Sequence, residues 1–243
     1  GLIPVRSFID KGQGFDGRPH NIWINAGDSV TDKMTTFANW AAREGAAVYV
    51  IPGTVGAPGQ AKAGDILQMQ AVVVDIDTGD IAAKRAHLER HLGPPTMVVE
   101  SGGVTPEGQR KAHVWWKLTE PAEGSDIARV TRIRGDIAAK VGGDMHFRSA
   151  HQPIRVAGSV YYKNNLKTQV RIVTLNAGLE RDLGEFTEAV TDMPPAPGVS
   201  LQPDFTTSDK PAVDDVLVTP VRESAQDDWS RFEGASAAIG YFI

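Results

Sequence analysis

Ala71-Val-Val-Val-Asp75-Ile-Asp77 is the segment from which the rest of the chain is best interpreted. The run of valines is typical of a buried strand, and it ends in two carboxylates. Because side chains alternate between the two faces of a strand, Asp75 and Asp77 are predicted to lie on one face. Two carboxylates held so close together either share a proton or bind a cation between them. Oxygen ligands of this kind favour Mg²⁺ or Mn²⁺, which serve phosphate chemistry.

The composition is that of a soluble globular protein with one large domain, or with one domain and an appendage. The chain has 243 residues, of which 41% are hydrophobic and 23% are charged. It has no cysteine, which excludes disulfides, a thiol nucleophile and cysteine-ligated metal sites within these residues. No apolar run approaches the roughly 20 residues of a membrane span, and the first residues lack a signal-peptide layout. We therefore expect a cytoplasmic protein with no membrane partner.

Charge is distributed unevenly along the chain. The net charge is −2 over residues 1–102, +6 over residues 103–175 and −9 over residues 176–243. The basic middle segment predicts a surface that binds a polyanion. From residue 176 prolines are frequent and periodicity is weak, so we expect a catalytic domain at 1–175 and an acidic, proline-containing linker or tail at 176–243. Residues 229–243 resemble a helix without a cap, which suggests the start of a truncated C-terminal helical region.

Local patterns predict a mixture of strands and helices. Three helices are expected to begin at Asp28 or Ser29, at about Asp80 and at Ser125, and each ends at glycine. The predicted strands cover residues 20–26, 47–51, 71–77, 96–100 and 111–118, with a closing hairpin formed by 154–163 and 169–175. This mixture predicts an α+β domain in which helices pack on a sheet.

Three further segments carry residues suited to phosphate chemistry. On the strand predicted at 111–118, alternation gives one face to apolar residues and the other to a cationic set. The members of this second face are Lys111, His113, Trp115 and Lys117. Gly142-Gly143-Asp144 adds a third acidic residue at a junction between a loop and a strand. The segment Ile154-Arg155-Val-Ala-Gly158-Ser-Val-Tyr-Tyr-Lys163 offers two cations beside a glycine that permits close backbone approach.

In their order and spacing these motifs resemble those of the archaeo-eukaryotic primase superfamily. The similarity covers roughly residues 18–175 and is greatest to the RepB-type primase and primase-polymerase domains of plasmids and phages. It implies an RNA-recognition-like antiparallel or mixed sheet, with helices packed on it and an N-terminal α/β unit. It also implies a nucleotidyltransferase, a DNA primase or DNA-directed polymerase that synthesises primers on single-stranded DNA during plasmid or phage replication.

The resemblance also implies roles for the acidic residues and for His113. Asp75, Asp77 and Asp144 match the family's ligands for two Mg²⁺ or Mn²⁺ ions. Two such ions can stabilise the attacking and leaving oxygens of an in-line phosphoryl displacement. His113 matches the family's strand histidine, which contacts the phosphates of the incoming nucleotide.

Basic residues complete the implied site. Arg155 and Lys163 match family positions that bind nucleotide or template. Lys111 stands where the family usually has serine, so either it makes a stronger phosphate contact or the alignment of this motif is shifted. The implied partners are a single-stranded DNA template, nucleoside triphosphates and a replicative helicase acting in cis or in trans.

Two other functions are compatible with parts of the sequence. A non-catalytic, replication-linked nucleic-acid-binding module could stack bases on Trp115, Tyr161 and Tyr162, but this hypothesis leaves three carboxylates unexplained. Another metal-dependent phosphoryl transferase, such as a phosphatase, or a glycosyltransferase could use the Asp-x-Asp motif. Phosphatases of this type place a threonine two residues after the second aspartate, whereas Thr78 follows Asp77 directly.

Overall fold

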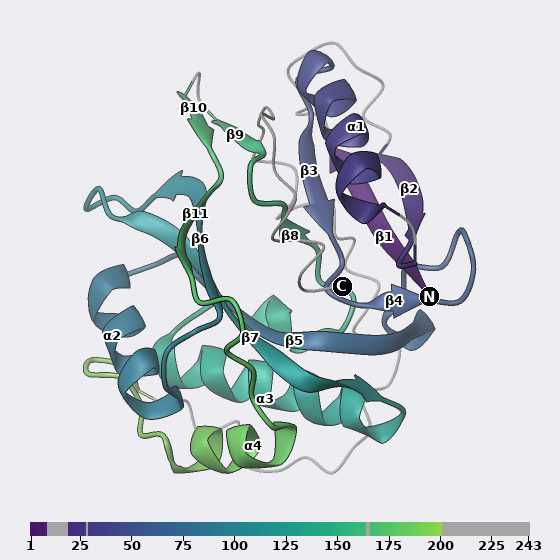
Figure 1. Cartoon of the computed structure of the whole chain (residues 1–243). Coiled ribbons are helices and arrows are strands. Elements are labelled where there is room, and N and C mark those ends of the chain that lie inside the picture. The colour runs from purple at the N-terminus through teal and green to yellow at the C-terminus, as the bar shows by residue number, and fades with distance from the viewer. Residues whose placement is uncertain (9–18, 28, 164–165, 201–243) are drawn as a thin grey trace.

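The computed structural model describes residues 1–8, 19–27, 29–163 and 166–200, which form one sheet with helices on its two sides (Figure 1). The sheet has nine strands in the order β11-β6-β7-β5-β4-β1-β3-β8, with β2 paired to β1. These strands are β1 (Leu2–Phe8), β2 (His20–Asn25), β3 (Ala47–Val50), β4 (Thr54–Val55), β5 (Ile66–Ile76), β6 (Met97–Val104), β7 (Arg110–Glu123), β8 (Ile154–Arg155) and β11 (Arg171–Leu175). A separate hairpin is formed by β9 (Val160–Lys163) and β10 (Leu166–Gln169). All pairings between these strands are antiparallel.

In the part of the chain that the structure describes, four α-helices and two short 3₁₀ helices surround the sheet. The α-helices are α1 (Val30–Arg43), α2 (Ile81–Leu92), α3 (Ser125–Val141) and α4 (Leu183–Asp192). The 3₁₀ helices are η1 (Ala63–Asp65) and η2 (Met145–Arg148). Within the described residues, none of the helices is long and apolar enough to cross a membrane. The prediction of an α+β domain with helices packed on a sheet is confirmed.

Alternation along β5 divides the apolar residues between two cores. Val72 and Val74 face a core that contains residues of α2, α3 and α4. Ala71 and Val73 face the other core, to which α1, β1 and β3 contribute. Figure 1 shows α1 beside β1–β3, away from the other three helices. Asp75 therefore lies on the same face of the sheet as Ala71 and Val73, the face that shares a core with α1, β1 and β3.

The neighbouring strand follows the same division. Trp116 is fully buried in the core that contains residues of α2, α3 and α4, which we call the helix-side core. Trp115 is buried in the other core. Burying side chains this large is a major part of the stability of such a sheet, since each removes roughly 150–250 Å² of surface from water. The residues that flank Trp115 on its face are Lys117 and His113. The register between β5 and β7 is thus fixed by two large cores, and it pairs Asp75 with His113.

The C-terminal part of the predicted domain differs from expectation. Residues 154–163 do not form one strand with 169–175 as its partner, so the predicted hairpin is wrong. A turn follows β8, in which Ser159 donates its backbone N–H to the carbonyl of Val156, and Gly158 has a φ of 86°. Because of this turn β8 pairs with β3, β9 pairs with β10, and β11 pairs with β6.

The prediction also lacked two of the longer elements, β1 and α4. Strand β1 contains Pro4 and Arg6, which obscure its pattern. Helix α4 begins at the cap Asp182 and places Phe186 and Val190 in the helix-side core. The division of the chain at residue 175 stays a prediction, and residues 201–243, including the predicted helix at 229–243, lie outside the described residues.

Candidate active site

Asp75 and Asp77 lie at the end of β5, the strand with the longest buried valine run. One carboxylate oxygen of Asp75, Oδ1, is buried and has no hydrogen-bond partner among the described residues. It lies 3.7 Å from Nε2 of His113 on the neighbouring strand. A buried, unsatisfied carboxylate oxygen is costly, and such atoms in native proteins usually have a ligand, an ion or a water as partner.

Asp144 reaches the same place through the turn that ends α3. Gly142 closes the helix in the left-handed conformation, with a φ of 60°. Gly143 then passes so close to β5 that a Cβ atom there would lie 2.7 Å from the backbone oxygen of Asp75. The backbone N–H of Asp144 donates to that same oxygen at 3.1 Å. The glycine pair is therefore needed to bring the third carboxylate next to the first two.

The gathered charges change the ionisation of Asp75. Burial is the largest cause that raises its pKa from 3.8 to about 8, and the carboxylates of Asp77 and Asp144 contribute to the same shift. The cations of Arg155 and Lys111 oppose the shift. A divalent cation would remove the repulsion and allow all three groups to ionise together.

These donors suit Mg²⁺ or Mn²⁺, because all of them are carboxylate oxygens. One of them, Oδ1 of Asp75, is buried and has no partner among the described residues. Among the described residues, no three acidic or imidazole groups are yet spaced to hold an ion. Ion binding would therefore require the side chains to move together. Asp144 now accepts hydrogen bonds on Oδ1 from the backbone N–H of His146 at 2.9 Å and from its imidazole Nδ1 at 2.7 Å.

His113 is buried beneath the acidic residues, with a side chain only 3% exposed. Burial, together with the charge of Arg155, lowers its pKa to about 3. The imidazole is therefore neutral, and its Nδ1 has no hydrogen-bond partner among the described residues. Its ring faces Asp75 and lies 6.5 Å from the ring of Phe147, measured between centroids. In this position His113 contacts Asp75, while the predicted contact with phosphate stays a prediction.

The other members of the predicted cationic face do not act together. Lys111 is about one-third exposed, and its Nζ lies 3.8 Å from Oδ2 of Asp77. Trp115 is buried in the core on this side of the sheet. Lys117 forms an ion pair with Glu180, with Nζ 2.8 Å from Oε1. Of the two lysines, only Lys111 therefore lies beside the acidic residues. The expectation of one continuous cationic face is wrong, because Trp115, in the middle of that face, belongs to the core.

Arg155 lies on β8. Its guanidinium carbon is 5.5 Å from the ring centroid of Tyr49 and 5.1 Å from that of Tyr161. Its charge acts on both Asp75 and His113. Lys163 is the last residue of β9, but its side chain is not among the described ones. The structure thus brings Arg155 toward the acidic residues and leaves the predicted role of Lys163 as a prediction.

Lys84 was not singled out by the sequence. It projects from the first turns of α2, and its Nζ donates to the backbone oxygens of Thr78 and Gly142. The sequence does contain one local signal for this position. Lys84 follows the N-cap Asp80 by four residues, so it lies about one turn into α2, at the same end of the helix as the cap. Asp80 itself accepts a hydrogen bond from the backbone N–H of Ala83, which is the role of a helix cap.

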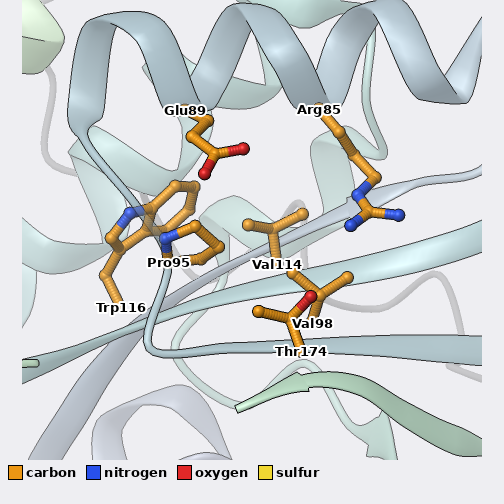
Figure 2. A pocket seen from close by; sticks show the side chains of 7 residues that line it. All are labelled: Arg85, Glu89, Pro95, Val98, Val114, Trp116 and Thr174. Carbon is orange, nitrogen blue, oxygen red and sulfur yellow. The ribbon is translucent and has the colours of Figure 1, made fainter. Parts of the chain in front are cut away.

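A small cavity lies elsewhere and does not belong to this site. It has a volume of about 40 Å³ and is lined by α2 and by sheet residues that include Val98, Val114 and Trp116. Figure 2 shows Arg85 and Glu89 of α2 above it. Val114 and Trp116 belong to the helix-side core, so the cavity is on the face of the sheet away from His113.

Comparisons with known proteins identify the fold. No family model and no curated protein matches the chain. Among solved structures, the archaeo-eukaryotic primase domain of the cyanophage S-2L primase-polymerase aligns with a TM-score of 0.57 at 18% identity, over 78% of this chain and 89% of that one. The chain therefore has the fold of an archaeo-eukaryotic primase domain, as the motifs predicted.

Two structures of primase RepB′ show the same likeness. One aligns with a TM-score of 0.53 at 16% identity, over 78% of this chain and 57% of that one. The other is the catalytic domain of RepB′ in complex with initiator DNA, with the same TM-score and identity and 85% of that chain covered. Both are primases, so the fold is shared with enzymes that the motifs also indicated.

Proposed function

We propose that this chain is the catalytic domain of a DNA primase or primase-polymerase. It would join nucleoside triphosphates on a single-stranded DNA template, as a nucleotidyltransferase in plasmid or phage replication. The observation that carries the proposal is that Asp75, Asp77 and Asp144 lie close enough for their charges to interact, while one oxygen of Asp75 is buried without a partner among the described residues. The primase-type fold and the likeness to a RepB′ catalytic domain solved in complex with initiator DNA support it.

In the proposed mechanism the three carboxylates hold Mg²⁺ or Mn²⁺. The ions supply charge stabilisation to the attacking and leaving oxygens when they are bound. Asp75 lies near the end of β5, Asp77 follows this strand directly, and Asp144 is brought close by the glycine turn, so the backbone already holds the three residues near one another before reaction. His113, with Nε2 3.7 Å from Oδ1 of Asp75, fixes one side of that carboxylate.

The cations are proposed to receive the triphosphate. Lys111 is partly exposed beside Asp77, where it can neutralise phosphate oxygens next to the ions. Arg155, on β8, has its guanidinium against two tyrosine rings, which restricts it to few orientations. Lys163 is proposed to contact nucleotide or template from the β9–β10 hairpin. A replicative helicase, in cis or in trans, is the proposed protein partner.

A non-catalytic nucleic-acid-binding module is less well supported. It would stack bases on exposed aromatic side chains. Trp115 is 5% exposed and Tyr161 is 8% exposed, so neither offers a ring face to a base. The stacking hypothesis also gives no role to three carboxylates that repel a nucleic acid unless a cation screens them.

Primer synthesis on a single-stranded DNA template tests the proposal. The wild-type chain and the Asp75→Ala/Asp77→Ala double variant are incubated with labelled nucleotides and Mg²⁺ or Mn²⁺. We expect short products from the wild type alone, with both proteins folded by circular dichroism. Equal synthesis by both proteins would contradict the assignment of the metal site. The absence of products from a folded wild type that binds Mn²⁺ would favour another phosphate substrate.

A further inference from the structure

Lys84 connects the two loops that carry the acidic residues. Its Nζ donates to the carbonyl oxygen of Thr78 at 2.8 Å and to that of Gly142 at 2.8 Å. Thr78 follows Asp77 directly, and Gly142 precedes Asp144 by two residues. One side chain from α2 therefore spans the gap between the end of β5 and the end of α3.

The surroundings favour a cation at this point. Gly142 caps the C-terminus of α3, where unpaired carbonyls carry the negative end of the helix dipole. The carboxylate of Asp77 is also near enough to attract the Lys84 ammonium. An ammonium has three donors, so it can serve two carbonyls and still present a charge to a nearby carboxylate.

The link made by Lys84 complements a second connection on the other side of the turn. There the backbone N–H of Asp144 bonds to the oxygen of Asp75 at 3.1 Å. The hydroxyl of Thr78 adds a longer contact to the carbonyl oxygen of Gly142 at 3.3 Å. Without Lys84, the hydrogen bonds between these two segments would be reduced to the backbone bond between Asp144 and Asp75 and the longer contact of Thr78.

We propose that Lys84 is a positioning residue that fixes the separation of Asp77 and Asp144 and thereby raises the affinity of the site for a divalent cation. The inference rests on the proposed function, because it assumes that these carboxylates bind metal. Residues that orient metal ligands typically contribute about 10–100-fold to metal affinity or activity. Since Lys84 acts through backbone groups, we expect the lower end of this range.

The test measures Mn²⁺ binding to the full chain by isothermal titration calorimetry, together with primer synthesis over a range of Mn²⁺ concentrations. Lys84→Met removes the donors and keeps the length of the side chain, whereas Lys84→Arg keeps the charge and two or more donors. Arg85→Met is the matched control, because it removes a positive charge from the adjacent residue of α2, which faces the cavity on the far side of the sheet (Figure 2).

We expect Lys84→Met to weaken Mn²⁺ binding about tenfold and to raise the Mn²⁺ concentration for half-maximal synthesis by a similar factor. Lys84→Arg should recover a large part of the loss, and Arg85→Met should match the wild type. Wild-type Mn²⁺ binding by a folded Lys84→Met variant would overturn the inference and leave the proposed function intact. A wild type that binds no Mn²⁺ would overturn both. If Lys84→Met does not fold, Lys84→Ala, which also removes the donors, is measured against the same two outcomes.

Discussion

Replacing Asp75 by asparagine should make the metal-free protein more stable at high pH. Asp75 has a pKa of about 8 in the folded chain, against 3.8 in its ordinary state, first because it is buried and then because Asp77 and Asp144 repel its charge. Asparagine has nearly the same shape and cannot ionise. The substitution therefore removes the cost of a buried negative charge and retains most of the packing against His113.

The sign follows from proton binding. Between about pH 4 and pH 8 the folded state retains a proton on Asp75 that the unfolded chain has released. Stability must then fall as pH rises through this window and level off above it. A difference of about four pKa units corresponds to an upper limit of about 6 kcal/mol, and relaxation of the site reduces this to a few kcal/mol. At pH 4 the two proteins should differ little.

Urea unfolding in the presence of EDTA at pH 5, 7 and 9 measures this effect as the difference between Asp75→Asn and the wild type. Asp126→Asn is the control, because it removes an exposed acidic group at the far end of α3 from Asp144. The stability advantage of Asp75→Asn should grow from pH 5 to pH 9, and replacing the EDTA with excess Mg²⁺ at pH 9 should stabilise the wild type alone. An advantage that stays constant over this range would refute the argument that Asp75 is a buried carboxyl among like charges.

Two other substitutions test the geometry of the site. Gly143→Ala should lower the free energy of unfolding by about 1–3 kcal/mol and reduce primer synthesis at least tenfold, because its Cβ would meet the backbone oxygen of Asp75 at 2.7 Å. Gly64→Ala is the control, because a Cβ there would meet open space, and it should change the free energy of unfolding by less than about 0.5 kcal/mol. Equal effects of Gly143→Ala and Gly64→Ala in urea unfolding would contradict the close approach of Gly143 to β5. Lys111→Ser should raise the KM for nucleotide several-fold in steady-state synthesis while changing stability by less than about 1 kcal/mol, since its pair with Asp77 is partly exposed. An unchanged KM would remove Lys111 from the phosphate site.

Regular elements were predictable wherever their pattern is local. The helix expected from residue 28 or 29 is α1, and the structure buries one face of it, formed by Val30, Met34, Phe37, Ala38 and Ala41. Each of these positions follows from a helical period of 3.6 residues. The strand with the two aspartates was predictable in the same way, from a run of valines that only a doubly covered strand can bury.

Prediction failed where pairing depends on distant residues. The segment 154–163 contains enough β-branched and aromatic residues for one strand, but β8 and β9 pair with different partners on either side of a turn. Helix α4 packs against α2 and α3, and these contacts cannot be predicted from the sequence of α4 alone. The burial of His113 was not predicted for a related reason. Its strand is covered on both faces, so even a polar residue on it can be enclosed, and this covering comes from distant parts of the chain.

The chain by itself determined the strand that leads to Asp75 and Asp77, the helices α2 and α3 and the motif order typical of a primase, because these depend on short-range spacing and residue type. Only the tertiary structure decided that Asp144 meets Asp75, because that contact requires the left-handed cap at Gly142 and a glycine small enough to pass beside β5. It also decided that Lys84 spans the two loops. These contacts join residues about 60–70 positions apart, and their geometry is fixed by how α2 and α3 pack on the sheet.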